Sequence, residues 1–120
     1  MQLIKSKDVD LTKKHKVFFS KKELQIILQL YSKQVSLGIC KDYSIDHSRN
    51  NAIFSFFKST FDKPIFQIEK KINVKNKYFF IFNLAYKQKI LESSISISKI
   101  LIRLEKKFQF FIKHKKDKNG

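Results

Sequence analysis

The stretch KDYSIDHSRNNAIFSFFK, residues 41–58, decides the fold because it predicts the first hairpin of an antiparallel sheet. Before a polar connection, Tyr43 and Ile45 alternate with polar residues, and after it Ala52, Phe54 and Phe56 share one face of an apolar run. A period of two is typical of a half-buried strand. Residues 46–51 between the two runs are rich in turn formers, so we expect them to join the strands.

The same connection places Asp46, His47 and Arg49 within four residues, which raises the alternatives of a catalytic loop or a binding tip. A general base needs a positioned partner and a concave site, whereas neighbours in a tight turn point in different directions. We therefore interpret the cluster as a surface turn, expect no catalytic residue and no enzyme, and keep Arg49 as a binding candidate. An enzyme would require a pocket that gathers Asp42, Asp46 and His47 with Tyr43 or Tyr86.

Upstream of the hairpin, FFSKKELQIILQLYSKQVSLG predicts an amphipathic helix. Ser20 and Glu23 have the spacing of a capping box. Gly38 stands where a left-handed residue would end the helix. The residues expected to form its apolar stripe are Leu24, Ile27, Leu28, Tyr31 and Val35.

Downstream, further alternating runs predict strands over residues 66–69 and 78–84, with a last short strand near Ile90. No helical pattern separates them, so a meander of four or five strands is the simplest arrangement. A second helix follows in SSISISKILIRLEKKFQFFIK, with Ser93 and Ser94 as expected N-caps. Its apolar stripe is expected to contain Ile97, Ile100, Leu101, Leu104, Phe108 and Phe111.

These elements predict an α+β fold: an N-terminal helix, an antiparallel meander of four to five short strands and a C-terminal helix in a two-layer sandwich. Apolar residues on the second sheet face leave two interpretations. The simpler one is that one helix covers each face. The other is that the second face is open and forms an interface for a protein partner or a homodimer, through Ile53, Phe57, Phe79 and Ile81.

The chain has 120 residues, which suits a single domain. We expect a mobile basic arm over residues 1–16, one α+β domain over residues 17–113 and a disordered basic tail over residues 114–120. The longest uncharged apolar run is too short to span a bilayer, so no transmembrane segment is expected.

Charge is the strongest functional signal, because 26 Lys and Arg against 10 Asp and Glu give a net charge of +16. Such a charge attracts polyanions. Only Arg49 and Arg103 are arginines, the residue best suited to bidentate phosphate and guanine contacts. Lysine accompanies abundant Ile, Phe and Asn, whose codons are A/T-rich, so genome composition contributes to the charge. The composition predicts weak polyanion affinity better than specific recognition.

Cofactor and metal signals are missing from the sequence. A single cysteine, Cys40, excludes an internal disulfide and suits a reducing cytoplasm, where we expect the protein. His15, His47 and His114 show no metal-ligand spacing with Cys40 or with each other. Two isolated glycines exclude a phosphate-cradling loop. We expect no cofactor.

Six strings together span about residues 17–107: FSKKEL, ILQLYSKQVSLG, KDYSID, AIFSFFK, PIFQIEKK and ISKILIRLEKK. They resemble a family of small conserved alphaproteobacterial proteins, the domain of unknown function 2794. A tryptophan that the family usually has before its Asp-Tyr pair is absent, and much of the family's arginine is lysine here. The resemblance implies a shared fold and a bacterial cytoplasmic setting, and it implies no catalytic residue.

We therefore expect a small, basic, non-enzymatic binding protein whose partner is RNA, DNA or a ribonucleoprotein. Lysines spaced by three or four line the face of the second helix that points away from the core. The expected polyanion-binding residues are Arg49, Lys99, Arg103, Lys106, Lys107, Lys113, Lys115 and Lys116. The alternative is a protein–protein adaptor or homodimer that uses the aromatic sheet face.

Overall fold

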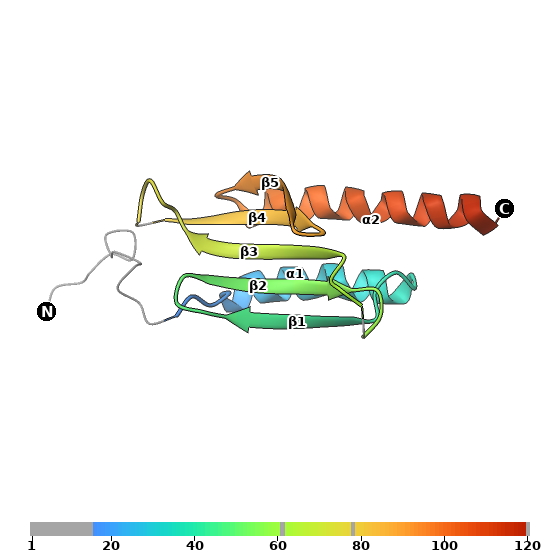
Figure 1. Cartoon of the computed structure of the whole chain (residues 1–120), viewed down its shortest axis with the longest axis horizontal. Helices are drawn as coiled ribbons and strands as arrows, with labels where there is room; N and C mark the ends of the chain where they lie inside the picture. The colour runs from blue at the N-terminus through green and yellow to red at the C-terminus, as the bar shows by residue number, and fades with distance from the viewer. Residues whose placement is uncertain (1–15, 61, 78, 120) are drawn as a thin grey trace, which may run out of the picture.

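A computed structural model describes residues 16–60, 62–77 and 79–119, and the side chains of these residues as far as residue 111. Along the chain, one helix precedes five strands and one helix follows them (Figure 1). The elements are α1 (Lys21–Ser36), β1 (Asp42–His47), β2 (Asn51–Phe57), β3 (Phe66–Ile72), β4 (Phe80–Tyr86), β5 (Lys89–Ser94) and α2 (Ile97–Asn119). The predicted α+β layout is confirmed. Residues 1–15, which hold most of the predicted basic arm, lie outside the described residues.

The sheet is an antiparallel meander in the order β1-β2-β3-β4-β5. Residues 41–58 form its first hairpin, with Tyr43 paired to Phe56 and Ile45 to Phe54. Strand β1 continues through His47, so the connection is shorter than expected. Its backbone closes with a 2.8 Å hydrogen bond from Ser48 N to the carbonyl oxygen of Asn51.

Both helices pack on the same face of the sheet (Figure 1). The largest side chains of the strands, Phe54, Phe56 and Phe66, are at most 2% exposed, because they point toward the helices. The ring of Phe108 in α2 lies 5.0 Å from that of Phe66 and 5.5 Å from that of Phe56. The expectation of one helix on each face is therefore wrong, and the sandwich has two layers.

Helix α1 begins and ends as its sequence predicts. The hydroxyl of Ser20 accepts a hydrogen bond from Glu23 N, and a carboxylate oxygen of Glu23 accepts one from Ser20 N. Gly38 adopts the left-handed conformation with φ of 76°. The predicted stripe is wrong at Val35, which is 42% exposed. Gln34 is buried in its place, because it lies two helical turns after Ile27 on the same line.

Helix α2 begins later than predicted. Ser93 and Ser94 belong to β5, where they pair with Asn83 and Phe82, so the prediction that they cap the helix is wrong. Ser96 caps it instead, accepting a 3.4 Å hydrogen bond from Lys99 N. The predicted apolar stripe is confirmed: Ile100, Leu104 and Phe108 are fully buried, and Ile97, Leu101 and Phe111 pack against the same core. The helix continues to Asn119, past the expected end at Lys113. Within the described residues, neither helix combines the length and apolarity needed to cross a bilayer.

Candidate functional site

The outward side of α2 carries three exposed basic residues, Lys99, Arg103 and Lys106, which we call the basic face of α2. They are spaced by three or four residues, and this spacing places them on one side of a helix. The opposite side holds Ile100 and Leu104, both fully buried. Because this buried side faces the sheet, the helix presents the basic face to solvent.

Two carboxylates lie close to this surface, and each is already paired. Glu105 accepts a 2.5 Å ion-pair contact from Lys33 of α1. Glu92 of β5 lies 3.9 Å from Nε of Arg103, a long contact between two exposed side chains. Lys99 and Lys106 have no ion pair among the residues that the structure describes. Their positive charge is therefore not neutralised locally.

The remaining residues of the predicted polyanion set are divided by the fold. Arg49 is exposed in the β1–β2 turn, at the opposite end of the molecule from the C-terminus of α2 (Figure 1). Lys107 is half-buried. The side chains of Lys113, Lys115 and Lys116 lie beyond those that the structure describes, although their backbone continues α2. Lys99, Arg103 and Lys106 are thus brought together, and Arg49 is not.

The acid–base cluster of the first hairpin does not assemble. Successive side chains of a strand point to opposite faces, so Asp46 and His47 of β1 point apart. Asp46 shares its face with Ile53, whereas the ring of His47 lies 4.4 Å from that of Phe18. Alternation likewise separates Asp42 from Tyr43. Across the described residues, no group of three or more His, Cys, Asp or Glu side chains could hold a metal ion.

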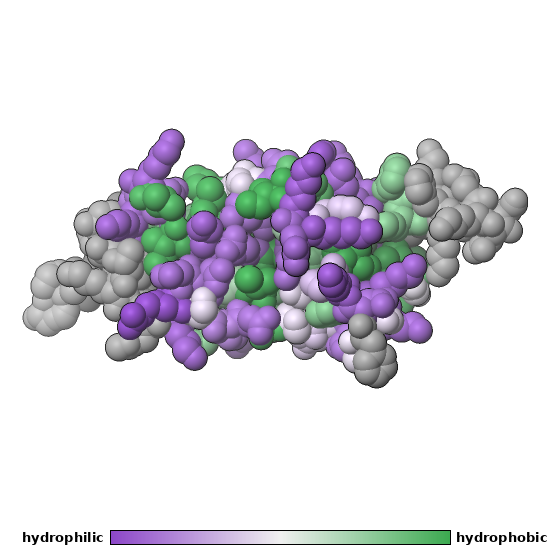
Figure 2. Space-filling model, viewed as in Figure 1, coloured by the Kyte–Doolittle hydropathy of each residue, from purple (hydrophilic) through white to green (hydrophobic). Residues whose placement is uncertain are grey.

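Three of the predicted interface residues, Ile53, Phe57 and Ile81, lie on the sheet face that the helices leave open, and all three are half-buried. Phe79, which directly precedes β4, is 48% exposed. Figure 2 shows this face as separate hydrophobic patches between hydrophilic side chains. The register explains the separation, because Ile53 lies between Asp46 and Glu69 and Ile81 is paired with Lys71.

A polar ladder that the sequence pattern does not reveal crosses the middle of the open face. Both carboxylate oxygens of Glu69 accept hydrogen bonds, at 2.8 Å from Asn51 Nδ2 and at 2.9 Å from Asn83 Nδ2. The hydroxyl of Ser93 donates to Asn83 Oδ1 at 2.5 Å. These four residues come from four strands, and only the strand register shows that they meet. Because their polar groups are satisfied within the chain, this part of the face needs no partner.

A second contact that the sequence pattern does not reveal joins α1 to the sheet. Lys70 of β3 is 5% exposed and points toward the helices. Its ammonium donates 2.8 Å hydrogen bonds to the carbonyl oxygen of Phe18 and to Oε1 of Glu23, and it lies 4.3 Å from the centre of the Phe80 ring. A buried charge is tolerated only with such partners. Lys70 therefore acts as a structural anchor and not as part of the basic surface.

Cys40 shows the features of an inert core thiol. It is 1% exposed, and burial raises the pKa of its thiol to about 12. The thiolate is the nucleophilic form, so the neutral thiol dominates at neutral pH. The nearby Gln34 accepts backbone hydrogen bonds from Ile39 and Cys40 through its carbonyl oxygen, whereas its side-chain Oε1 has no hydrogen-bond partner among the residues that the structure describes.

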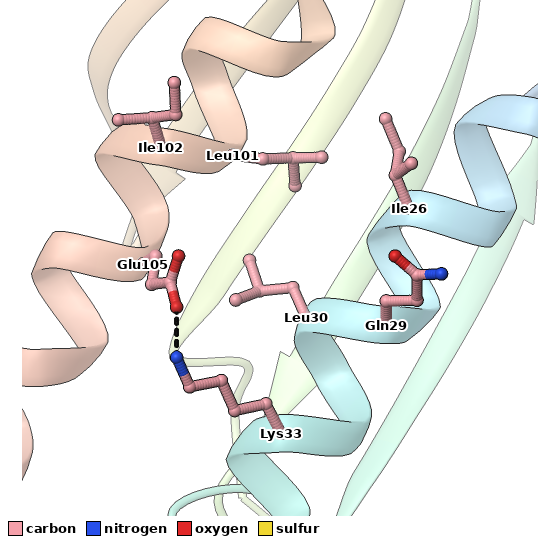
Figure 3. A pocket seen from close by; sticks show the side chains of 7 residues that line it. All are labelled: Ile26, Gln29, Leu30, Lys33, Leu101, Ile102 and Glu105. Carbon is pink, nitrogen blue, oxygen red and sulfur yellow. Dashed lines mark hydrogen bonds and ion pairs between the residues drawn. The ribbon is translucent and has the colours of Figure 1, made fainter.

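A groove of about 280 Å³ lies between α1 and α2 on the outer side of the helix layer (Figure 3). Leu30 and Leu101 point toward each other across it, and the ion pair between Lys33 and Glu105 closes one end. Its volume is at the lower limit of small-molecule pockets, which begin at about 300 Å³. The groove therefore suits a few apolar side chains better than a whole cofactor. Its lining residues are Ile26, Gln29, Leu30, Lys33, Leu101, Ile102 and Glu105.

Comparison with known proteins identifies the family of the chain. The model of the family described as "Protein of unknown function (DUF2794)" matches residues 17–101, which include α1, the whole sheet and the first turn of α2. No curated relative and no solved structure matches the chain. Since the matched region is more than half of the chain, the protein belongs to this family.

Proposed function

We propose that this member of the family is a non-enzymatic binding module that contacts RNA, DNA or a ribonucleoprotein through the basic face of α2. The observation that carries the proposal is that Lys99 and Lys106 are exposed and without an ion pair among the described residues, on a helix whose core-facing residues pack against the sheet. Lysine ammonium groups bind phosphates as point charges. Such partners suit the cytoplasmic location that the sequence predicts.

Lysine contacts of this kind are expected to read the backbone and not the bases. Phosphate contacts position a protein on a nucleic acid, while sequence is read by donors and acceptors at the base edges. Arg103, the one arginine of the surface, already lies beside Glu92. We therefore expect similar affinities for different sequences and a strong dependence on salt.

Binding of a fluorescent single-stranded RNA and of a duplex DNA of equal length tests the proposal. The variant Lys99→Gln/Lys106→Gln is expected to weaken binding of both at least about tenfold at moderate salt. The matched control is Lys21→Gln/Lys22→Gln, which removes the same charge from exposed positions of α1. An equal loss in the two variants would mean that total charge, and not this surface, attracts the nucleic acid.

An adaptor or homodimer that uses the open sheet face is the second candidate, favoured by the placement of both helices on the other face. Phe79 is its most exposed aromatic residue, at 48%. The mass in solution decides this case. A monomer that Phe57→Ser and Phe79→Ser leave unchanged would rule out the homodimer.

A further inference from the structure

We infer that the groove between α1 and α2 is a docking site for an acidic amphipathic helix of a partner protein. The inference goes beyond nucleic-acid binding, because it adds the apolar side chains that line the groove to the lysines of the basic face. Recognition of a helix in a groove uses apolar anchors at helical spacing and charged residues at the rim.

The apolar part of the site is exposed although it lies between two packed helices. Ile102 is 59% exposed and Ile26 is half-buried, and both line the groove above Leu30 and Leu101. Ile102 lies outside the buried stripe of α2, so most of its side chain remains in water. It provides apolar area that a partner side chain would remove from water.

The charge around these isoleucines is positive, and it identifies the partner's chemistry. Lys99 and Lys106 lie three residues before and four residues after Ile102, and Lys22 lies four residues before Ile26, so each isoleucine shares its side of the helix with lysines. None of the three lysines has an ion pair among the described residues. The one acidic residue that lines the groove, Glu105, is paired with Lys33. An acidic rim on the partner would complement this arrangement.

The shape favours a helix over a flat lipid surface. Side chains of a docked helix would project into the space between α1 and α2 that Figure 3 shows, while its acidic residues faced the lysines. A membrane surface would engage outward residues such as Ile95 as well as Ile102, whereas a docked helix would engage only the residues that line the groove.

A designed peptide of about 18 residues, long enough to form a helix, tests the inference. Its leucines follow helical spacing and its other positions are glutamate. A scrambled peptide of equal composition controls for charge and total hydrophobicity. We expect the full-length protein to bind the patterned peptide at least about tenfold more tightly than the scrambled one. Equal binding of the two peptides would overturn the inference.

The variant Ile26→Gln/Ile102→Gln locates the site, and Ile95→Gln is the matched control. Ile95 is 71% exposed and does not line the groove. The groove variant is expected to lose the preference for the patterned peptide, while the control keeps it, with both melting like the wild-type protein. Vesicles that contain phosphatidylserine, and the RNA used above, provide the remaining comparisons. If the groove variant keeps the preference for the patterned peptide, the inference is contradicted. If the groove variant loses vesicle or RNA binding to the same extent as it loses peptide binding, the surface belongs to another occupant and the inference is contradicted as well.

Discussion

The two helices bury similar apolar stripes on one face of the same sheet, yet they differ in how their N-termini are held. Glu23 of α1 caps the helix and also accepts an ion pair from Lys70 of β3. Helix α2 has a long Ser96 cap contact at its start and extends beyond the ends of the strands (Figure 1). The difference indicates that a buried ion pair ties α1 to the sheet, whereas α2 leaves its outward side exposed, and this is the side for which we propose a binding role.

This division predicts that substitutions in the anchor of α1 change stability and that substitutions on the outward side of α2 change binding. For each contact in the fold, a nearby position outside that contact can take the same substitution and serves as the control. The comparison is therefore testable residue by residue.

The largest expected effect is that of Lys70→Met. The substitution leaves the Glu23 carboxylate and the Phe18 carbonyl without their buried donor, and breaking a buried pair costs about 3–5 kcal/mol of unfolding free energy. Urea unfolding measures it. The control is Lys71→Met, one residue along on the open face, where a loss below about 1 kcal/mol is expected. Equal losses would show that Lys70 is no anchor.

Within α2, Leu104→Ala and Ile102→Ala separate the buried side from the outward side. Leu104 is fully buried, so its truncation is expected to cost about 2–4 kcal/mol through lost burial and the remaining cavity. Ile102 is 59% exposed, and its truncation is expected to cost less than about 1 kcal/mol. Thermal unfolding of both variants compares them. Similar melting temperatures would contradict the packing of α2 described above.

A smaller loss is expected from Ser20→Ala, which removes the cap of α1. The hydroxyl of Ser20 satisfies the backbone N–H of Glu23, and losing such a cap costs about 1 kcal/mol. Ser32→Ala, at an exposed position in the middle of the same helix, is the control and is expected to cost nothing, because alanine is the better helix former. The prediction fails if denaturant midpoints rank the two variants in the opposite order.

Much of the fold follows from local patterns. The capping box of Ser20, the left-handed Gly38 and the stripe of α2 each depend on residues within a few positions, and the structure confirms them. The hairpin of residues 41–58 follows from its alternation and turn formers. Such features are set by the period of a helix or strand, which the sequence shows directly.

The features that the sequence does not predict depend on contacts between distant segments. Lys70 looks like an ordinary strand residue in the sequence, because its partners, Phe18 and Glu23, lie about fifty positions earlier. The sequence does not show that both helices pack on one face of the sheet, because apolar residues occur on both sheet faces. Only the structure shows which face carries the fully buried aromatic residues. The start of α2 differs from the prediction because β5 pairs through Ser94, a contact that depends on β4.

The candidate site is predictable in part. Helical spacing alone is enough to place Lys99, Arg103 and Lys106 on one side of α2. Spacing does not show that Arg49 lies at the far end, or that Glu92 and Glu105 pair with Arg103 and Lys33. The groove between the helices is not predictable in this way, because it requires two segments about seventy residues apart to lie side by side.

The salt dependence of duplex DNA binding tests the central claim, that α2 presents the charge, most directly. The slope of log K against log salt counts the phosphates that the protein neutralises. The claim predicts that Lys99→Gln/Lys106→Gln lowers this slope by about two, about one for each lysine, and that Lys21→Gln/Lys22→Gln leaves it unchanged. Equal slopes for the α2 variant and the wild-type protein, or the same decrease in both variants, would contradict the claim.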